Sequence, residues 1–463
     1  MATRKPKSLG PELTRFLKKY PGTETMELLI PDMHGILRGK RIRKPDFKKV
    51  CEEGLYFCAG ATMLTVLGET VSGMPYTESD GDPDLPAALV PGSIAPVPWA
   101  KKPTGQALFR LFYDNGDNFF GDPRSILENA LQPFHERGLR IVMATELEFY
   151  LLQDVSRRPT PHAPTVPGMS RPQPGAQVFH PDDLWEIEAF INEVYEYCDA
   201  QNIPADAAIS EYAQGQFEIN LRHIDDPVLA CDHALLLKRV IKASARKHGM
   251  VACFMAKPFA DTSGSGLHIH MSMYEKAGKN FFVEGKGQNP EAPFSKKLQH
   301  AVGGLLQLMP ESTALFAPNI NSYRRLRADM FAPVEPNWGF NHRVVAVRIP
   351  ESDNKNLRFE HRVAGADANP FLVTAAILAG VDYGLKNKIQ PPAMIEQGTR
   401  VSPKQKIPNR WDDALDKFAR SRVLPEYLGA EYFKTFLVNR RAECTQFHNE
   451  VSLLDYEWYL RAV

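Results

Sequence analysis

Three segments of this chain place ionisable side chains two residues apart, with mostly apolar residues between them. They are ATELEFYLL at 144–152, SGSGLHIHMSM at 263–273 and NLRFEHRVAG at 356–365. A period of two is that of a β-strand, so each segment directs its charges to one face and its apolar side chains to the other. Like charges on a buried face are costly unless a cation or an opposite charge pairs with them. We therefore expect these strands to surround one shared polar space.

A fourth segment, SEYAQGQFEINLR at 210–222, adds two more acids. Taken singly, an E-x-E strand is more typical of a solvated face, and an H-x-H strand of core or surface. Taken together, the segments offer an oxygen-dominated ligand set that suits Mg²⁺ or Mn²⁺ better than zinc. Its members are five carboxylates and one imidazole: Glu146, Glu148, Glu211, Glu218, Glu360 and His268.

Arginines are dense in and before the NLRFEHRVAG segment. Surface charge is one interpretation, but arginine also binds carboxylate and phosphate through two parallel hydrogen bonds. Metal ligands together with arginines are typical of phosphoryl transfer. Neither a Walker-type nor a dinucleotide-binding glycine motif follows a strand, so a nucleotide pocket would be of another kind. The seven arginines are Arg324, Arg325, Arg327, Arg343, Arg348, Arg358 and Arg362.

The composition argues against several classes of protein. Lys+Arg and Asp+Glu both total 55 in 463 residues, so no excess charge indicates a nucleic-acid or membrane partner. Six cysteines without a CxxC pair suit a reducing compartment, and we expect a cytoplasmic protein. The longest apolar stretch, 371–381, is too short to span a bilayer and is predicted to be a buried helix.

The order of patterns predicts a small N-terminal domain and a larger α+β or α/β domain, with a boundary near 118. The run TMELLIPDMHGILRGKRI is typical of a hairpin turning at Gly35, and a helix is expected to open at Asp122-Pro123. The proline-rich segment 154–177 is either a lid or a simple excursion. Further helices are predicted at 124–138, 182–201, 226–248, 293–310 and 370–386, and strands at 140–152, 203–209, 215–223, 250–255, 266–273, 343–349 and 357–363.

Six ordered motifs, ELEF, EYAQGQFEINL, GSGLHIHMS, NSYRRL, NHRVVAVRIP and RFEHRVAGADANPFL, resemble the successive signatures of the glutamine synthetase family. Within that family, the stretch 203–239 is especially similar to γ-glutamylputrescine synthetases. The resemblance implies an α+β fold, with an N-terminal β-grasp domain at 20–116 and a catalytic domain with a funnel-shaped antiparallel sheet at 121–463. It also implies a homo-oligomer, a dodecamer of two stacked hexameric rings, with active sites at subunit interfaces.

The resemblance assigns a role to each motif residue. It implies two to three Mg²⁺ or Mn²⁺ ions, with Glu148, Glu211 and Glu218 holding the first, and Glu146, His268 and Glu360 holding the second. Glutamate would bind at Ser263, Gly264, Arg325 and Arg362, although asparagine is usual at position 263. ATP would bind at His270, Ser272, Arg343, Arg348 and Arg358, with Arg343 and Arg362 also serving catalysis.

The amine site departs from the family pattern. Cys58 and Phe331 stand where ammonia-using members carry two acids, and the nearest aromatic residue in the 170–182 loop is Phe179. Losing both acids weakens binding of NH₄⁺ and leaves apolar room for methylene groups, each worth about 0.8 kcal/mol when buried. Cys58 is interpreted as a small apolar residue, with a reactive thiol as the alternative. Glu211 is the remaining acid that could accept the proton of the amine.

The resemblance therefore implies an ATP-dependent ligase that joins the γ-carboxylate of glutamate to an organic amine through a γ-glutamyl phosphate. A polyamine such as putrescine is the first candidate. The alternatives are a monoamine of the ethanolamine, methylamine, isopropylamine or aniline type, ammonia itself, or a structural relative without catalysis. A structural relative would be expected to lose metal ligands, and all six are present.

Overall fold

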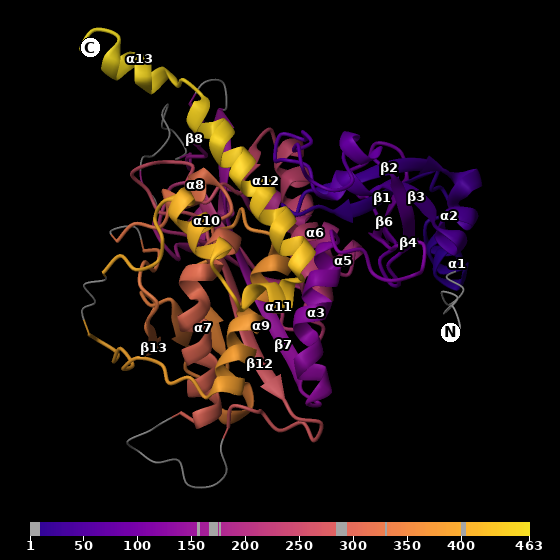
Figure 1. Ribbon diagram of the computed structural model, residues 1–463. Helices are drawn as coiled ribbons and strands as arrows, with labels where there is room; N and C mark the ends of the chain where they lie inside the picture. The colour runs from indigo at the N-terminus through magenta and orange to yellow at the C-terminus, as the bar shows by residue number, and fades with distance from the viewer. Residues whose placement is uncertain are drawn as a thin grey trace.

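The computed structural model describes residues 10–154, 158–165, 175, 177–283, 294–328, 331–399 and 404–463. Two mixed assemblies of helix and sheet lie side by side, and the smaller N-terminal one forms the indigo part of Figure 1. The fold is α+β, as predicted. Within the described residues, no helix combines the length and apolarity needed to cross a membrane. The apolar stretch 371–381 is a buried part of a helix.

The N-terminal sheet contains the predicted hairpin. Its strands are β1 (Thr25–Pro31), β2 (Leu37–Arg43), β3 (Leu55–Cys58), β4 (Asp84–Leu89), β5 (Ala95–Pro96) and β6 (Thr104–Leu111). The order is β2-β1-β6-β4-β3, with β5 paired to β6 and with β1 parallel to β6. Gly35 turns the hairpin with a φ of 77°, a left-handed conformation that glycine adopts without strain.

The larger sheet carries the charged strands. It runs β13-β14-β15-β12-β7-β10-β9, with β8 and β11 also paired to β7, and only β13 and β14 are parallel. The 15-residue β7 lies at its centre. The strands are β7 (Arg140–Asp154), β8 (Thr160–Pro161), β9 (Ala205–Ser210), β10 (Gln216–Leu221), β11 (Val251–Cys253), β12 (Leu267–Tyr274), β13 (Trp338–Phe340), β14 (Val347–Ile349) and β15 (Phe359–His361).

Helices pack around this sheet, and the yellow α12 runs across the molecule in Figure 1. The predicted start of α3 is confirmed, because the Asp122 side chain caps the helix by accepting from the Arg124 amide at 2.9 Å. The helices are α1 (Gly10–Lys19), α2 (Phe47–Glu53), α3 (Pro123–Glu136), α4 (Pro181–Trp185), α5 (Glu188–Ala200), α6 (Pro227–Lys247), α7 (Lys296–Phe316), α8 (Ile320–Tyr323), α9 (Pro370–Asn387), α10 (Trp411–Ala419), α11 (Leu424–Leu428), α12 (Ala430–Asn449) and α13 (Leu453–Tyr459).

Several predicted elements differ from the structure. The strands predicted at 250–255 and 357–363 are shorter, at Val251–Cys253 and Phe359–His361. The pattern at 182–201 forms two helices, α4 and α5, and the helix predicted at 293–310 continues to Phe316 with Pro310 inside it. The strand predicted at 343–349 begins only at Val347, because residues 342–345 form a turn. Most of the 154–177 segment lies outside the described residues, so neither interpretation of it is tested. The domain bounds 20–116 and 121–463 stay a prediction.

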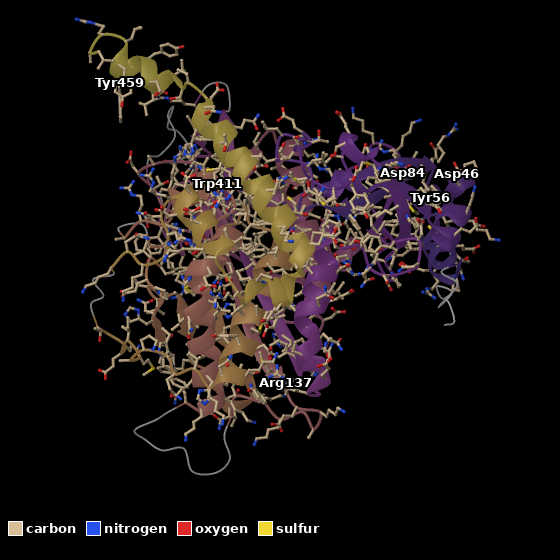
Figure 2. The ribbon with its side chains drawn as sticks, in the orientation of Figure 1. Asp46, Tyr56, Asp84, Arg137, Trp411 and Tyr459 are labelled. Carbon is tan, nitrogen blue, oxygen red and sulfur yellow. The ribbon has the colours of Figure 1, made fainter. Side chains whose placement is uncertain are left out.

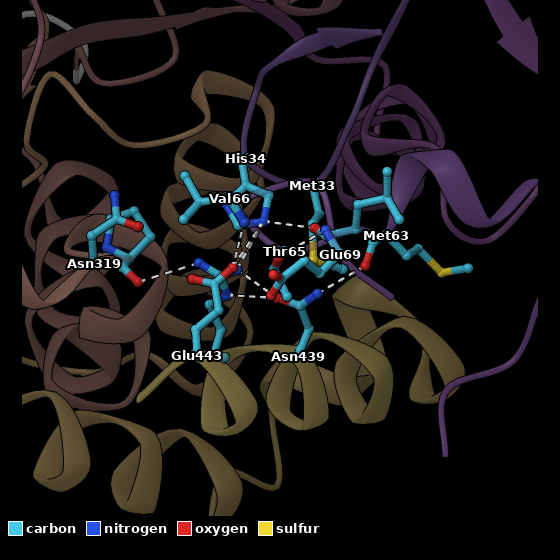
Figure 3. A network of polar contacts seen from close by, with 12 residues as sticks. Met33, His34, Met63, Thr65, Val66, Glu69, Asn319, Asn439 and Glu443 are labelled. Carbon is cyan, nitrogen blue, oxygen red and sulfur yellow. Dashed lines mark hydrogen bonds and ion pairs between the residues drawn. The ribbon is translucent and has the colours of Figure 1, made fainter. Parts of the chain in front are cut away.

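A buried polar network joins the N-terminal region to α12 (Figure 3). The Glu443 carboxylate accepts hydrogen bonds from the Val66 amide and the Arg440 guanidinium, both at 2.6 Å. Arg440 also lies 2.8 Å from His34 Nε2, and Asn439 donates to the Met63 carbonyl at 2.8 Å. Only 1% of Arg440 is exposed, so its pairing with Glu443 is shielded from solvent.

We expect Arg440→Met to destabilise the protein by about 3–5 kcal/mol, because the Glu443 carboxylate would stay buried without its cation. The free energy of unfolding from urea titration measures the loss. Arg441→Met is the matched control, since Arg441 pairs with Asp416 at the surface and both side chains are about half exposed. The control should change stability by less than about 1 kcal/mol, and equal losses in the two variants would contradict the role given to Arg440.

Candidate active site

The register of the larger sheet places the predicted ionisable residues opposite one another. Glu218 of β10 pairs with Glu148 of β7, and His268 of β12 pairs with Glu146 of β7. On the other side of β12, His270 pairs with Glu360 of β15. Residues paired across strands have their side chains on the same face. The strands thus meet around one polar space, as their alternation predicts.

His268 lies at the centre of this acidic cluster. Its Nδ1 is 3.1 Å from Glu146 Oε2 and 3.9 Å from Glu360 Oε1, while its Nε2 is 3.8 Å from Glu148 Oε1. Two trios offer ligand atoms within 4.8 Å of one another: Glu146, Glu218 and His268, and Glu146, His270 and Glu360. His270, expected at the nucleotide, thus also lies beside candidate metal ligands.

The carboxylates repel one another strongly in the absence of a cation. Burial raises the pKa of Glu218 well above its ordinary value, and Glu146, Glu148 and Glu211 raise it further. Burial and the nearby Glu148 carboxylate raise the pKa of Glu211 to about 7. Divalent cations fit this donor set. They would supply the missing positive charge, and the oxygen and imidazole groups that could bind them are already in place.

Two arginines bracket the end of the cluster at Glu360, which is fully buried. Arg348 donates to Glu360 Oε2 at 3.0 Å, and Arg362 donates to Glu360 Oε1. Burial alone would raise the pKa of Glu360, but Arg362 and His270 outweigh it and lower that pKa. Arg358 extends the row by donating to His270 Nδ1 at 3.3 Å. These cations lie where an anionic group could bind between metal ions and guanidinium groups.

The other two predicted nucleotide residues are Arg343 and Ser272. Arg343 is exposed in the turn before β14, and the structure brings it to none of the acids by a described contact. Ser272 is buried on β12, two residues beyond His270 on the same face of the strand. The alternation therefore correctly predicted that Ser272 lies on the face of the site. The strand predicted at 343–349 does not extend back to Arg343.

The residues expected to bind glutamate form a corner at the start of β12, in which Arg325 is buried and Ser263, Gly264 and Arg362 are half-buried. A Cβ at Gly264 would lie 2.4 Å from the Ala256 carbonyl oxygen and 2.8 Å from Arg325 Cγ, so the site requires glycine. Arg325 is buried and donates to the Val363 carbonyl at 2.7 Å. This corner leaves backbone and guanidinium donors beside the acidic cluster.

Sequence reasoning missed Gln216 and Tyr150. Gln216 Nε2 donates to Glu148 Oε2 at 3.3 Å and to the Gly264 carbonyl at 3.1 Å, and Gln216 Oε1 accepts from Ser263. The Tyr150 hydroxyl donates to the Ser263 carbonyl at 2.6 Å. Both residues stand two positions from a predicted ligand, on the same strand face. The alternation that identified the acids could have found them.

The amine-site candidates occupy two separate places. Phe331 stacks on Tyr212, the neighbour of Glu211, with ring centroids 4.9 Å apart, and both rings are more than half exposed. The exposed Phe179 is connected to the same region, since its amide donates to the Ser210 carbonyl at 2.9 Å.

Cys58 instead ends β3 in the N-terminal sheet, where its thiol donates to Asp82 Oδ1 at 3.1 Å. Tyr56 and Asp84, on β3 and the adjacent β4, lie on the side of this sheet away from the larger domain (Figure 2). Burial raises the pKa of the Cys58 thiol, and its hydrogen bond to Asp82 raises it further. This fits a protonated side chain better than a reactive thiolate.

The family model of the glutamine synthetase catalytic domain matches residues 120–459. The chain belongs to the glutamine synthetase family. Its similarity to the γ-glutamylputrescine synthetase PuuA of Escherichia coli (strain K12) is 39% identity, covering 97% of this chain and 94% of that protein. The glutamate–isopropylamine ligase of a Pseudomonas species is 33% identical, with 96% of each chain covered.

Solved structures agree with this membership. The structure titled "Apo GmaS without ligand" has a TM-score of 0.81 and 27% identity, and covers 97% of this chain and 99% of that one. As a member of the glutamine synthetase family, the protein is an ATP-dependent glutamate–amine ligase. Use of ATP and divalent metal ions is general in the family, and the acidic cluster contains groups that could hold such ions.

We expect Mg²⁺ to raise the thermal unfolding midpoint of this glutamine synthetase-family ligase, because a bound cation offsets the repulsion in the cluster. At 100 times the dissociation constant, one site adds about 2.7 kcal/mol. Glu218→Gln should make the metal-free protein more stable and reduce its response to Mg²⁺. Glu196→Gln, an exposed change on α5, is the control. The same Mg²⁺ response in both variants would show that Glu218 is not a ligand.

Proposed function

We propose that the protein ligates the γ-carboxylate of glutamate to an organic amine through a γ-glutamyl phosphate, and that the amine is a polyamine such as putrescine. The observation that carries this proposal is the replacement of acids by Cys58 and by Phe331, which forms an aromatic pair with Tyr212 beside Glu211. The similarity to a γ-glutamylputrescine synthetase supports it.

In this proposal, two to three divalent ions bind at the acidic cluster. Glu148, Glu211 and Glu218 would hold the first ion, and Glu146, His268 and Glu360 the second. His270 is a further candidate ligand, because its ring lies in one trio with Glu146 and Glu360. Such ions would supply positive charge that neutralises the phosphates of ATP and the acyl phosphate. Arg348, Arg358 and Arg362 would stabilise the transferred phosphoryl group, and Arg325 would hold the α-carboxylate of glutamate.

The amine must lose a proton before it attacks the acyl phosphate. An alkylamine resembles a lysine side chain, with a pKa of about 10.4, so very little of it is neutral near pH 7. Glu211 directly precedes Tyr212 of the aromatic pair, so its carboxylate belongs to the region proposed to receive the amine. We assign Glu211 the role of orienting the amine and accepting its proton.

The exposed aromatic pair gives an organic amine an advantage over ammonia. Ring faces attract an ammonium group by roughly 0.5–1 kcal/mol at exposed sites, and they also cover methylene groups. Ammonium would gain only the first of these contacts. An organic cation with a carbon chain therefore suits Tyr212 and Phe331 better.

The position of Cys58 supports an active site shared between subunits. Cys58 and Phe331 belong to separate regions of one chain, so a neighbouring copy would have to bring its Cys58 to the amine site. A homo-oligomer is further supported by α13, which extends away from the body of the protein with Tyr459 in Figure 2. Its flank exposes apolar side chains that a second copy could cover: Leu453, Trp458 and Leu460.

Asp82 favours a diamine over a monoamine. A diamine carries a second ammonium group, which needs an anionic partner when its carbon chain is buried. Asp82 Oδ1 lies 3.1 Å from the Cys58 sulfur. If a neighbouring copy places its Cys58 at the amine site, it would therefore also place the Asp82 carboxylate there. A γ-glutamyl monoamine ligase is the second candidate, favoured by the similarity to the isopropylamine ligase.

Phosphate release from ATP and glutamate with Mg²⁺ tests the substrate class. We expect putrescine or a longer polyamine to stimulate release most, with ammonium, ethanolamine, methylamine, isopropylamine and aniline assayed one at a time. Omitting glutamate is the control for uncoupled hydrolysis. Strong stimulation by a monoamine would favour the second candidate. Stimulation by ammonium alone would mean that Cys58 and Phe331 do not define an organic-amine site.

We expect Asp82→Asn to raise the KM for putrescine about 10- to 100-fold, because a hydrogen bond to a charged group is worth about 1.5–3 kcal/mol. The KM for a monoamine such as isopropylamine should stay unchanged, since it has no second ammonium. Asp46→Asn is the matched control, being another exposed acid of the N-terminal region. Equal effects on both amines would show that Asp82 does not recognise the second ammonium group. The proposed ligase chemistry would not be affected by that result.

A further inference from the structure

A second group of metal-ligand residues lies where α10 meets α12, outside the acidic cluster. Cys444 and His448 are four residues apart on α12 and therefore share one face of the helix. Asp412 stands in the first turn of α10 and faces them. The Cys444 thiol donates to Asp412 Oδ1 at 3.1 Å, and its sulfur is 3.7 Å from His448 Nδ1. His448 Nδ1 is 3.9 Å from Asp412 Oδ2.

These separations, 3.1–3.9 Å, lie within about 0.6 Å of the edges of a tetrahedral zinc site. Zinc binds thiolate at about 2.3 Å and imidazole or carboxylate at about 2.0–2.2 Å, which places ligand atoms roughly 3.4–3.6 Å apart. One ligand atom from each of the three side chains already lies within 4.8 Å of the others. Rotation of the exposed Asp412 carboxylate would suffice to bring one oxygen into place.

We propose that Asp412, Cys444 and His448 form a Zn²⁺ site that ties the first turn of α10 to the last turns of α12. Binding breaks the S–H bond of Cys444 and forms a zinc–sulfur bond, and the thiol proton, which is hydrogen-bonded to Asp412 in the absence of metal, is released to solvent. Water fills the fourth position. The buried thiol and the two exposed ligands, whose side chains are 55% and 46% exposed, leave an entry path from solvent.

The chemistry of this site differs from that of the acidic cluster. A thiolate, an imidazole and a carboxylate prefer zinc, whereas a cluster of five carboxylates suits Mg²⁺ or Mn²⁺. The three ligands carry two negative charges once the thiol is ionised, which Zn²⁺ balances. Arg324 and Arg410 line the pocket next to His448, and Arg441 lies near Cys444. The positive charge of these arginines weakens the electrostatic attraction of the site for any cation. The bond to the thiolate must therefore provide the preference for zinc over Mg²⁺.

The test uses the full-length protein, stripped of metal with a chelator and then saturated with Mg²⁺ to occupy the acidic cluster. Co²⁺ is titrated in, and the absorbance of thiolate-to-cobalt charge transfer is recorded. The acidic cluster contains no cysteine, so Co²⁺ bound there gives no such band. We expect the band to appear with the parent protein and to disappear when Zn²⁺ displaces Co²⁺.

Two variants decide whether Cys444 and His448 are ligands. Cys444→Ser should lose the band, and His448→Gln should weaken it while keeping Mg²⁺-dependent phosphate release, since His448 is half exposed and its loss leaves the core intact. Cys253→Ser and His223→Gln are the controls and should keep the band. No band in the parent protein, or a band that persists in Cys444→Ser, would overturn the site and leave only a thiol–carboxylate hydrogen bond.

Discussion

Repulsion among buried carboxylates is the constraint on which the larger sheet depends. Glu148 and Glu218 face each other across two paired strands, and like charges in that position destabilise a sheet. The register cannot slip to separate them, because a shift of one residue would send Leu147 and Ile219 from the core to the polar face. The apolar face thus holds the acids in place, and cations complete the arrangement. One face of these strands packs in the core, and the opposite face carries the candidate metal ligands.

The acidic cluster has a direction that suits phosphoryl transfer. Near Glu218 the charged neighbours are mainly other carboxylates and His268, and Arg362 offsets only part of their effect on the pKa of Glu218. Cations from solution would balance the remaining negative charge at this end. Near Glu360, Arg348 and Arg362 already provide positive charge. A substrate with phosphate groups would therefore find bound metal at one end and fixed guanidinium groups at the other. This gradient is consistent with an ATP-dependent ligase.

The parts of the site that could be predicted from sequence are those with a local period. Alternation on a strand placed Glu146, Glu148, His268 and Glu360 on faces that the structure brings together. It failed for Arg343, because a turn occupies the predicted start of that strand. Contacts between distant segments have no such period. Nothing in the spacing of Tyr212 and Phe331, or of His34 and Arg440, indicates that these side chains touch.

The last long helix, α12, shows how one element serves several neighbours. Arg440 and Glu443 face the N-terminal region, and Cys444 and His448 face α10, so adjacent positions point to different partners. A helix with contacts on several sides cannot show a clean apolar stripe, and α12 was accordingly not predicted. Because the polar network holds one part of α12 and the α10 contact holds its end, movement of α12 would disturb both.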